Sequence, residues 1–196
     1  GTQITRCELI DEVKIIKPNL FMSCLNLETV VIGENVTTIG AHAFEGCKSL
    51  KSINIPNSVT DIGAYAFKNC SSLNNVSIPI SVTTIGAAAF ANCVSLESIH
   101  IPNKVTKINA SMFDGCSSLT SVTIPESVTR IEKNAFYKCS SLDSIIIPNS
   151  VISIGESAFC RCSSLTSVTI PNNVTSLENY VFNQCTNLKN VYLGYG

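Results

Sequence analysis

The sequence predicts a right-handed solenoid of parallel strands that forms a single domain over residues 1–196. A motif of 23 residues recurs along the chain without an insertion or a deletion, and each copy is too short to bury its own apolar face. Within the motif, apolar and polar residues alternate over a short β-branched stretch, which is typical of a strand with one buried face. Successive copies should therefore stack, pair their strands in parallel and connect them in the preferred right-handed sense.

Aligned columns of apolar residues define the copies. Leucines and eight of the ten cysteines also recur every 23 residues, and all eight phenylalanines share one column: Phe21, Phe44, Phe67, Phe90, Phe113, Phe136, Phe159 and Phe182. Seven full copies occupy residues 21–181, and a truncated copy follows in residues 182–196. A degenerate copy in residues 1–20 places apolar residues on the same columns: Ile4, Cys7, Leu9, Val13 and Ile16. We expect Cys7 to lie in the core.

Each copy predicts four elements in a fixed order. In residues 119–124 the alternation predicts a strand, which Pro125 ends because proline lacks the N–H that a ladder needs. Residues 128–131 are rich in β-branched side chains and predict a second, short extended segment. Glycines such as Gly63 and Gly86 follow that segment and permit a corner with positive φ. The alanine-rich residues 86–90 then predict a short helical turn.

The cysteine column is better explained by packing than by chemistry. Its residues stand beside the inward phenylalanines and leucines, so we expect a stacked ladder of buried thiols that act as small apolar side chains. Disulfides between adjacent coils fit less well, because stacked side chains point in the same direction and a disulfide needs converging Cβ vectors. A zinc site lacks the close cysteine pairs that it requires. Cys160 lies in a variable column of mostly polar residues, which predicts an exposed thiol.

Composition argues against several classes of function. The formal net charge is −1, so nothing points to nucleic acid or to an anionic membrane as a partner. No apolar run is long enough for a membrane span. His42 and His100 lie in different columns of the repeat, and we expect both side chains to be exposed to solvent. Because no motif for a nucleophile, a phosphate loop or a metal is present, we expect neither an enzyme nor a bound cofactor.

The outward positions of the predicted strands form the best candidate site. Most of them hold small polar residues, as expected for a solvated sheet face. Repeat proteins commonly use the concave side of such a sheet for binding. Five outward residues are the candidates for ligand contact: Val31, Asn54, His100, Ile146 and Tyr192. They are spread along the whole array, which favours a protein-sized contact over a small-molecule pocket.

The motif L-x-x-[VI]-x-I-P, together with V-x-x-I-G and A-F-x-x-C at fixed offsets, resembles the BspA-like, Treponema-type leucine-rich repeat family. The likeness covers nearly the whole chain from about Ile4. It implies a leucine-rich-repeat solenoid and a bacterial or protozoan protein of the cell surface or the extracellular space. Several family members are taken to be adhesins. The resemblance supplies no catalytic residue, and it carries no ligand specificity.

Two functions from different classes remain open at this stage. The first is an extracellular adhesion module whose partner is a host protein, another extracellular protein or a glycan. The second is a structural spacer or stalk within a larger surface protein, which the near-identity of the copies favours. The chain ends within a coil after an apolar strand, which predicts further repeats or a cap beyond residue 196. An uncovered strand edge at that end would allow end-to-end self-association.

Overall fold

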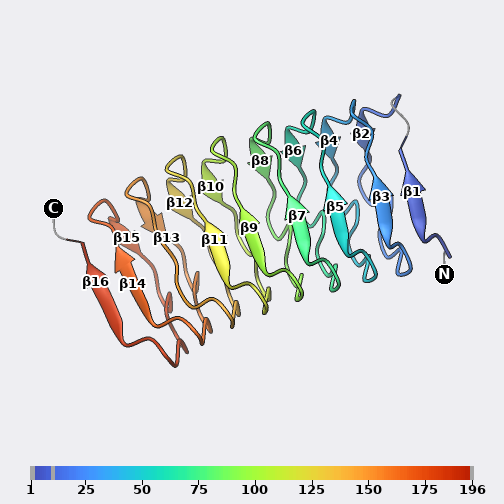
Figure 1. Ribbon diagram of the computed structural model, residues 1–196. Coiled ribbons are helices and arrows are strands. Elements are labelled where there is room, and N and C mark those ends of the chain that lie inside the picture. The colour runs from blue at the N-terminus through green and yellow to red at the C-terminus, as the bar shows by residue number, and fades with distance from the viewer. Residues whose placement is uncertain (1–2, 10–11, 195–196) are drawn as a thin grey trace.

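The computed structural model describes residues 3–9 and 12–194, which form a row of stacked coils (Figure 1). We number the coils by their phenylalanines, so that coil 1 begins at Phe21 and coil 8 at Phe182, and the degenerate first copy is coil 0. The predicted solenoid is confirmed, including extended segments in coil 0. No helix occurs among the described residues, and hence none that could span a membrane.

One broad side of the row carries the first ladder of parallel strands, and we call it the strand face. The register equals one repeat, so that Ser52 pairs with Asn75 and Ile53 with Val76. In β3, β5, β7 and β9 the middle residue is buried and its two neighbours are exposed, as the alternation predicts, and in β1 and β11 the middle residue is half-buried. The strands are β1 (Arg6–Glu8), β3 (Thr29–Val31), β5 (Ser52–Asn54), β7 (Asn75–Ser77), β9 (Ser98–His100), β11 (Ser121–Thr123), β14 (Ser167–Ile170) and β16 (Asn190–Leu193). Coil 6 follows the same course over residues 143–147 without a regular strand.

The second extended segments form another parallel ladder on the opposite side of the core. Each strand has two residues, of which the second is buried in all but the last. The strands are β2 (Ile15–Ile16), β4 (Thr38–Ile39), β6 (Asp61–Ile62), β8 (Thr84–Ile85), β10 (Lys107–Ile108), β12 (Arg130–Ile131), β13 (Ser153–Ile154) and β15 (Ser176–Leu177). Both ladders are therefore placed where the repeat predicts them.

Between coils 3 and 4 both ladders are interrupted, since β7 does not pair with β9, nor β8 with β10. Two residues depart from their columns at this seam, Asn109, which stands in the column of Gly63 and Gly86, and Met112. The column of Met112, directly before the phenylalanines, otherwise holds alanine in the inner coils, and the larger Met112 is fully buried. The rings of Phe90 and Phe113, which directly follow Ala89 and Met112 in the chain, have centroids 5.9 Å apart, the widest spacing among the stacked pairs. At the seam the side-chain amide of Asn109 donates to the Ile85 carbonyl over 2.6 Å.

A continuous column of phenylalanine rings fills the core. Neighbouring rings are nearly parallel, with centroids 5.2 Å apart for Phe136 and Phe159 and 5.4 Å apart for Phe44 and Phe67. Six of the rings, in coils 2 to 7, are fully buried. Offset parallel rings at this spacing attract each other beyond the gain from burial, so each coil is bound to the next through its aromatic side chain.

The cysteine column confirms the prediction of buried thiols. The ten cysteines, all among the described residues, form no disulfide. From coil 2 onward each Sγ donates to the phenylalanine carbonyl of the preceding coil, as Cys93 does to Phe67 over 3.1 Å. The same carbonyl accepts the N–H of its own coil's cysteine, Cys70. The thiols therefore act as weak donors that link adjacent coils. Cys7 is only half-buried, because its coil lies at the end of the row.

The predicted helical turn is wrong. Residues 40–47 form successive tight turns, in which N–H groups bond alternately within the turn and to the next coil. Ala43 donates to Gly40 and Cys47 to Phe44, whereas the Phe44 N–H reaches the Ala66 carbonyl of the following coil. The third residue of the first and last turns has positive φ, as a type II turn requires. Two columns share this geometry; in coils 1 and 2 they hold Ser23, His42, Gly46 and Tyr65.

The predicted role of the glycines that follow the second strands is also wrong. Gly63 and Gly86 do not have positive φ; they are needed because adjacent coils approach closely. A Cβ on Gly63 would lie 2.5 Å from the backbone nitrogen of Ala41, and a Cβ on Gly40 would lie 2.6 Å from the Ile16 carbonyl oxygen. A side chain at either glycine would require the neighbouring backbone to shift, whereas three other coils carry a side chain in this column, at Asn109, Glu132 and Glu178. Of the described glycines only Gly46 and Gly115 have positive φ, both in the later turn.

Candidate binding surface

The structure brings the five sequence-predicted candidates into one column on the strand face. Val31 pairs with Asn54 on the next strand, His100 with Thr123, and Tyr192 with Thr169. Neighbouring strands lie about 4.8 Å apart, so the column runs along the row of coils. The candidates therefore form a line across many coils, and no small pocket gathers them.

Several of these side chains expose apolar area to solvent. Ile146 is 84% exposed, Tyr192 55% and Val31 45%. Ile146 stands between Ile145 and Ile147, which are both buried, because strand-like alternation turns its neighbours toward the core. Nothing in the packing of the core requires an isoleucine at the exposed position, so these side chains are available for contact with a partner.

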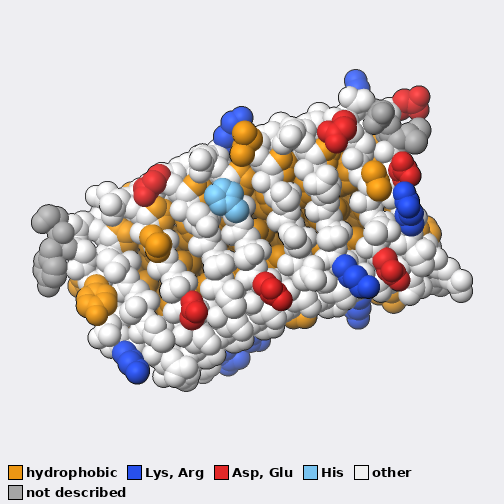
Figure 2. Space-filling view, in the orientation of Figure 1, with side chains coloured by type: hydrophobic (Ala, Val, Ile, Leu, Met, Phe, Trp, Pro, Cys, Tyr) orange, Lys and Arg blue, Asp and Glu red, His pale blue; other side chains and the backbone are white. Residues whose placement is uncertain are grey.

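Charged side chains of both signs lie mainly along the two borders of the strand face, and few lie across its middle (Figure 2). The border before the strands carries Lys51, Glu97, Asp143 and Lys189, all exposed. None of these four takes part in an ion pair among the described residues. The face thus combines a weakly polar centre with unpaired charges along one side.

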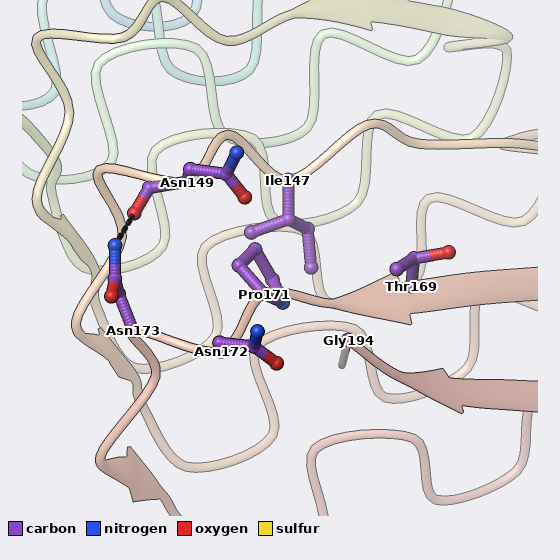
Figure 3. A pocket seen from close by; sticks show the side chains of 7 residues that line it. All are labelled: Ile147, Asn149, Thr169, Pro171, Asn172, Asn173 and Gly194. Atoms are coloured by element: carbon purple, nitrogen blue, oxygen red, sulfur yellow. Dashed lines mark hydrogen bonds between the residues drawn. The ribbon is translucent and has the colours of Figure 1, made fainter. Parts of the chain in front are cut away.

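A hollow of about 400 Å³ lies at the C-terminal end of the strand face. It is lined by Ile147, Asn149, Thr169, Pro171, Asn172, Asn173 and Gly194, shown in Figure 3. The Asn173 amide donates to the Asn149 carbonyl over 2.7 Å and so fixes the corner of the hollow. Gly194 occupies the column that holds proline in the inner coils, and the absence of a ring there leaves the space open.

Sequence reasoning missed a second cluster on the turns. His42 was expected to be solvated, but its ring stacks on Tyr65 with centroids 4.7 Å apart and bonds to Glu45. Lys68 lies over the Tyr65 ring and 3.6 Å from a Glu45 oxygen. The cluster draws on different columns of adjacent coils. Its signal in the sequence is the run of bulky residues at turn positions that hold alanine in coils 3 and 4.

Nearby, Tyr65 and Lys68 also line a hollow of about 210 Å³ whose far side is Asp114. Partial burial raises the pKa of the Asp114 carboxyl, while Lys138 and Lys68 act in the opposite direction. The small side chains of Ala88 and Ala91 form its floor. The hollow is shallow, and it lies away from the strand face.

Burial raises the pKa of most of the thiols in the folded chain. Burial raises the pKa of Cys47 and Cys116 to about 12, and it raises the pKa of Cys93 and Cys139 well above the ordinary value. Because the thiolate is the reactive form, burial lowers the reactivity of these four side chains at neutral pH. No group of three or more His, Cys, Asp or Glu side chains in the described part of the chain is arranged to hold a metal ion.

The expectation of an exposed Cys160 is wrong, since this residue is only 5% exposed. In its column Tyr137 and Asn183 stand on the neighbouring coils, and their longer side chains shield the shorter thiol. The same effect buries Ala91, which follows Lys68 and precedes Asp114 in that column. Exposure at the turns therefore depends on the lengths of neighbouring side chains, which a single column does not reveal.

The chain belongs to the BspA-type leucine-rich repeat family. The family model for the BspA type leucine rich repeat region matches residues 1–120 and 106–195. A search of curated proteins finds no match. The repeat motif and the stacked coils thus agree with the family assignment that the sequence suggested.

Solved structures of bacterial leucine-rich repeat proteins share this fold. One from Bacteroides ovatus is 30% identical, with a TM-score of 0.85, and the match covers 97% of this chain and 55% of that one. The leucine-rich repeat protein of T. pallidum is 29% identical, with a TM-score of 0.77 and coverage of 84% and 79%. A leucine-rich cell surface protein from Faecalibacterium prausnitzii is 23% identical, with a TM-score of 0.66 and coverage of 100% and 89%. The chain thus spans little more than half of the Bacteroides ovatus protein.

Proposed function

We propose that this chain is a non-enzymatic binding module of a cell-surface or secreted protein, and that the strand face contacts an extracellular protein. The observation that carries the proposal is the line of exposed large side chains along an otherwise small and polar sheet. His100, Ile146 and Tyr192 stand on it with no packing role. Aromatic and apolar anchors surrounded by polar positions are typical of protein contact surfaces.

One further observation supports an extracellular setting. The structurally similar protein from Faecalibacterium prausnitzii is described as a cell surface protein. Free thiols are more usual in reducing compartments, but their burial here protects the folded chain from oxidants, so the thiols do not oppose the proposal. An adhesion role follows from the proposal when the partner belongs to another cell or to its matrix.

The test replaces three strand-face residues together. The variant His100→Thr, Ile146→Thr and Tyr192→Thr copies the threonines already present in that column, so the fold should persist. Beads coated with the chain are applied to a panel of immobilised extracellular matrix glycoproteins, and bound beads are counted. We expect the wild type to bind at least one of these proteins and the variant to lose most of that binding.

A matched control removes exposed apolar area elsewhere. Ile80 is 76% exposed and Ile152 is 42% exposed, and both lie outside the candidate column. The variant Ile80→Asn with Ile152→Thr should bind like the wild type. If the strand-face variant also binds like the wild type, the contact does not lie on this face.

A structural spacer is the second candidate function. The near-identical coils favour it, because a spacer needs no varied residues, and inter-coil bonds such as Thr60 Oγ1 to the Thr37 carbonyl at 3.3 Å stiffen the row. A wild-type chain that binds no member of the panel, while a longer parent protein does, would favour the spacer.

A further inference from the structure

From coil 2 to coil 8 the candidate column of the strand face alternates with a period of two coils, which coil 1, with Glu28 and Val31, does not follow. Large side chains occupy the candidate column in the even coils, and small hydroxyl side chains occupy it between them. The even coils carry Asn54, His100, Ile146 and Tyr192, and the coils between them carry Ser77, Thr123 and Thr169. The segment CSSLTSVTIP, which recurs at residues 116–125 and 162–171, belongs to two of the coils with small residues.

The column before the strands follows the same period of two coils from coil 2 onward. It is charged in every even coil, with Lys51, Glu97, Asp143 and Lys189, and uncharged in the coils between them. Coils 2, 4 and 6 also have an exposed asparagine after the proline (Asn57, Asn103 and Asn149), although coil 7 carries one too, Asn172. Each of these even coils therefore presents the same row: a charge at one border, a large side chain in the middle and an amide at the other border.

The rows leave small side chains between them at regular intervals. With strands about 4.8 Å apart, rows two coils apart are separated by about 9.6 Å. The exposed Ser77, Thr123 and Thr169 lie between the larger side chains of the even coils, and we call these three positions the recesses. Thr169 also lines the hollow of about 400 Å³ at the C-terminal end, together with Asn149 and Gly194 (Figure 3).

This spacing distinguishes between the regular conformations of a peptide ligand. A polyproline II helix has three residues per turn and advances about 9.3 Å per turn. After three turns its residues are therefore displaced from the rows of the strand face by only about 1 Å. Two turns of an α-helix advance about 10.8 Å, so that its residues would be displaced from the rows by more than about 3 Å after three rows. A β-strand returns to the same face every two residues, about 6.7 Å, and falls between the rows.

We infer that the strand face binds a polyproline II segment of a partner protein, lying along the row of coils with one residue per turn entering the recesses over Ser77, Thr123 and Thr169. This inference rests on the proposed function and names the conformation of its partner. A polyproline II backbone has no internal hydrogen bonds, so its carbonyls are open to donors such as the amides of Asn103 and Asn149. The His100 and Tyr192 rings supply the aromatic walls against which proline rings pack.

Charge specifies the ligand further. Along the border the even coils read positive at Lys51, negative at Glu97 and Asp143, and positive at Lys189. A complementary segment carries one charged residue per turn in the order negative, positive, positive, negative. Because this order reads the same in both directions, it suits either orientation of the segment.

The test uses a synthetic probe with this order. The labelled peptide PPEPPKPPKPPE is titrated with the full chain, and fluorescence anisotropy gives its affinity. Its control is the charge-inverted peptide PPKPPEPPEPPK, which has the same composition of proline and the same net charge. We expect roughly tenfold tighter binding of the first peptide, with the preference shrinking at high salt because the charge pairs are exposed.

A charge-inverted chain provides the reciprocal test. The variant Lys51→Glu, Glu97→Lys, Asp143→Lys and Lys189→Glu alters only exposed side chains, and unchanged thermal unfolding shows that it folds. It should prefer the charge-inverted peptide. A third peptide, in which glycine replaces each proline, keeps the charges but loses the polyproline II conformation, and it should bind at least tenfold more weakly.

Several results would overturn the inference: equal binding of the two charged proline peptides, binding of neither, or equal binding of the glycine peptide. Binding of a linear glycan on the strand face, with no binding of the proline peptides, would also overturn it. If the strand-face variant loses binding to the glycoprotein panel and no proline peptide competes, the proposed function stands and the polyproline II inference is wrong.

Discussion

Removing one ring from the phenylalanine column should separate the array into two parts that unfold independently. Phe67 is fully buried, and its ring centroid lies 5.4 Å from those of Phe44 and Phe90. Phe67→Ala leaves a cavity and removes both ring contacts. Burial and cavity terms for Phe→Ala amount to about 3–5 kcal/mol, and the two lost ring pairs place this variant near the upper end.

Phe21 is the matched comparison at the end of the column. It is 9% exposed and stacks with Phe44 alone, at 5.3 Å. Phe21→Ala should therefore cost about 2–3 kcal/mol. Phe67→Leu, which keeps much of the buried volume, should cost less than about 1.5 kcal/mol.

Urea unfolding followed by far-UV circular dichroism measures these costs, and hydrogen exchange locates them. Because each coil contacts only its neighbours, Phe67→Ala should split the unfolding transition and lower exchange protection most strongly in coils 1 to 3. Equal costs for Phe67→Ala and Phe21→Ala would refute the reasoning, since a continuous stack must lose more in its interior than at its end.

Further predictions concern glycines and thiols. Gly63→Ala should destabilise the chain by about 3 kcal/mol or more in urea unfolding, since its Cβ meets backbone at 2.5 Å. Gly46→Ala, where φ is +75° and space is free, should cost only about 1 kcal/mol, and Gly46→Asn less; a larger cost at Gly46 than at Gly63 would contradict the close-approach argument. Burial raises the pKa of Cys47 and Cys116 from 9.0 to about 12, so folding favours their protonated forms. Stability should be complete below about pH 9 and fall as the pH rises toward 12; the urea midpoint measures this, and a shallower loss in Cys47→Ser with Cys116→Ser would assign it. A thiol reagent at neutral pH should modify few cysteines in the native chain and ten in denaturant, and a denatured count well below ten would contradict the absence of disulfides.

The repeat was enough to predict the coils, both ladders and the core columns, because each depends on a pattern that recurs many times. The turns could not be predicted in the same way. The alanines of residues 86–90 have high helix propensity, but the coil places alternate N–H groups toward the next coil, and those bonds between coils override local preference. The seam between coils 3 and 4 could not be predicted either, because it lies where Asn109 and Met112 each depart from their columns, and a repeat pattern does not show what a single departure does.

The candidate surface was predicted in part. Alternation correctly placed His100 and Ile146 on the outside of the strand face, since the period of a strand fixes the direction of each side chain. The burial of Cys160 was missed because accessibility at a turn depends on the lengths of side chains from adjacent coils. The stacking of His42 on Tyr65 was missed for a related reason: the two residues are 23 positions apart and become neighbours only when the coils stack.

The ladder of thiols imposes an order of events on the synthesis of this protein. In the unfolded chain the thiols ionise near their ordinary pKa, and the eight column cysteines alone could pair in 105 ways. Oxidation before folding would therefore trap the chain in cross-linked forms, since no disulfide belongs to the native structure. Folding has to outpace oxidation wherever the chain meets an oxidant. The coils make this feasible, because every contact between neighbours closes a loop of only about one repeat, so that folding can begin at any coil and extend to the next.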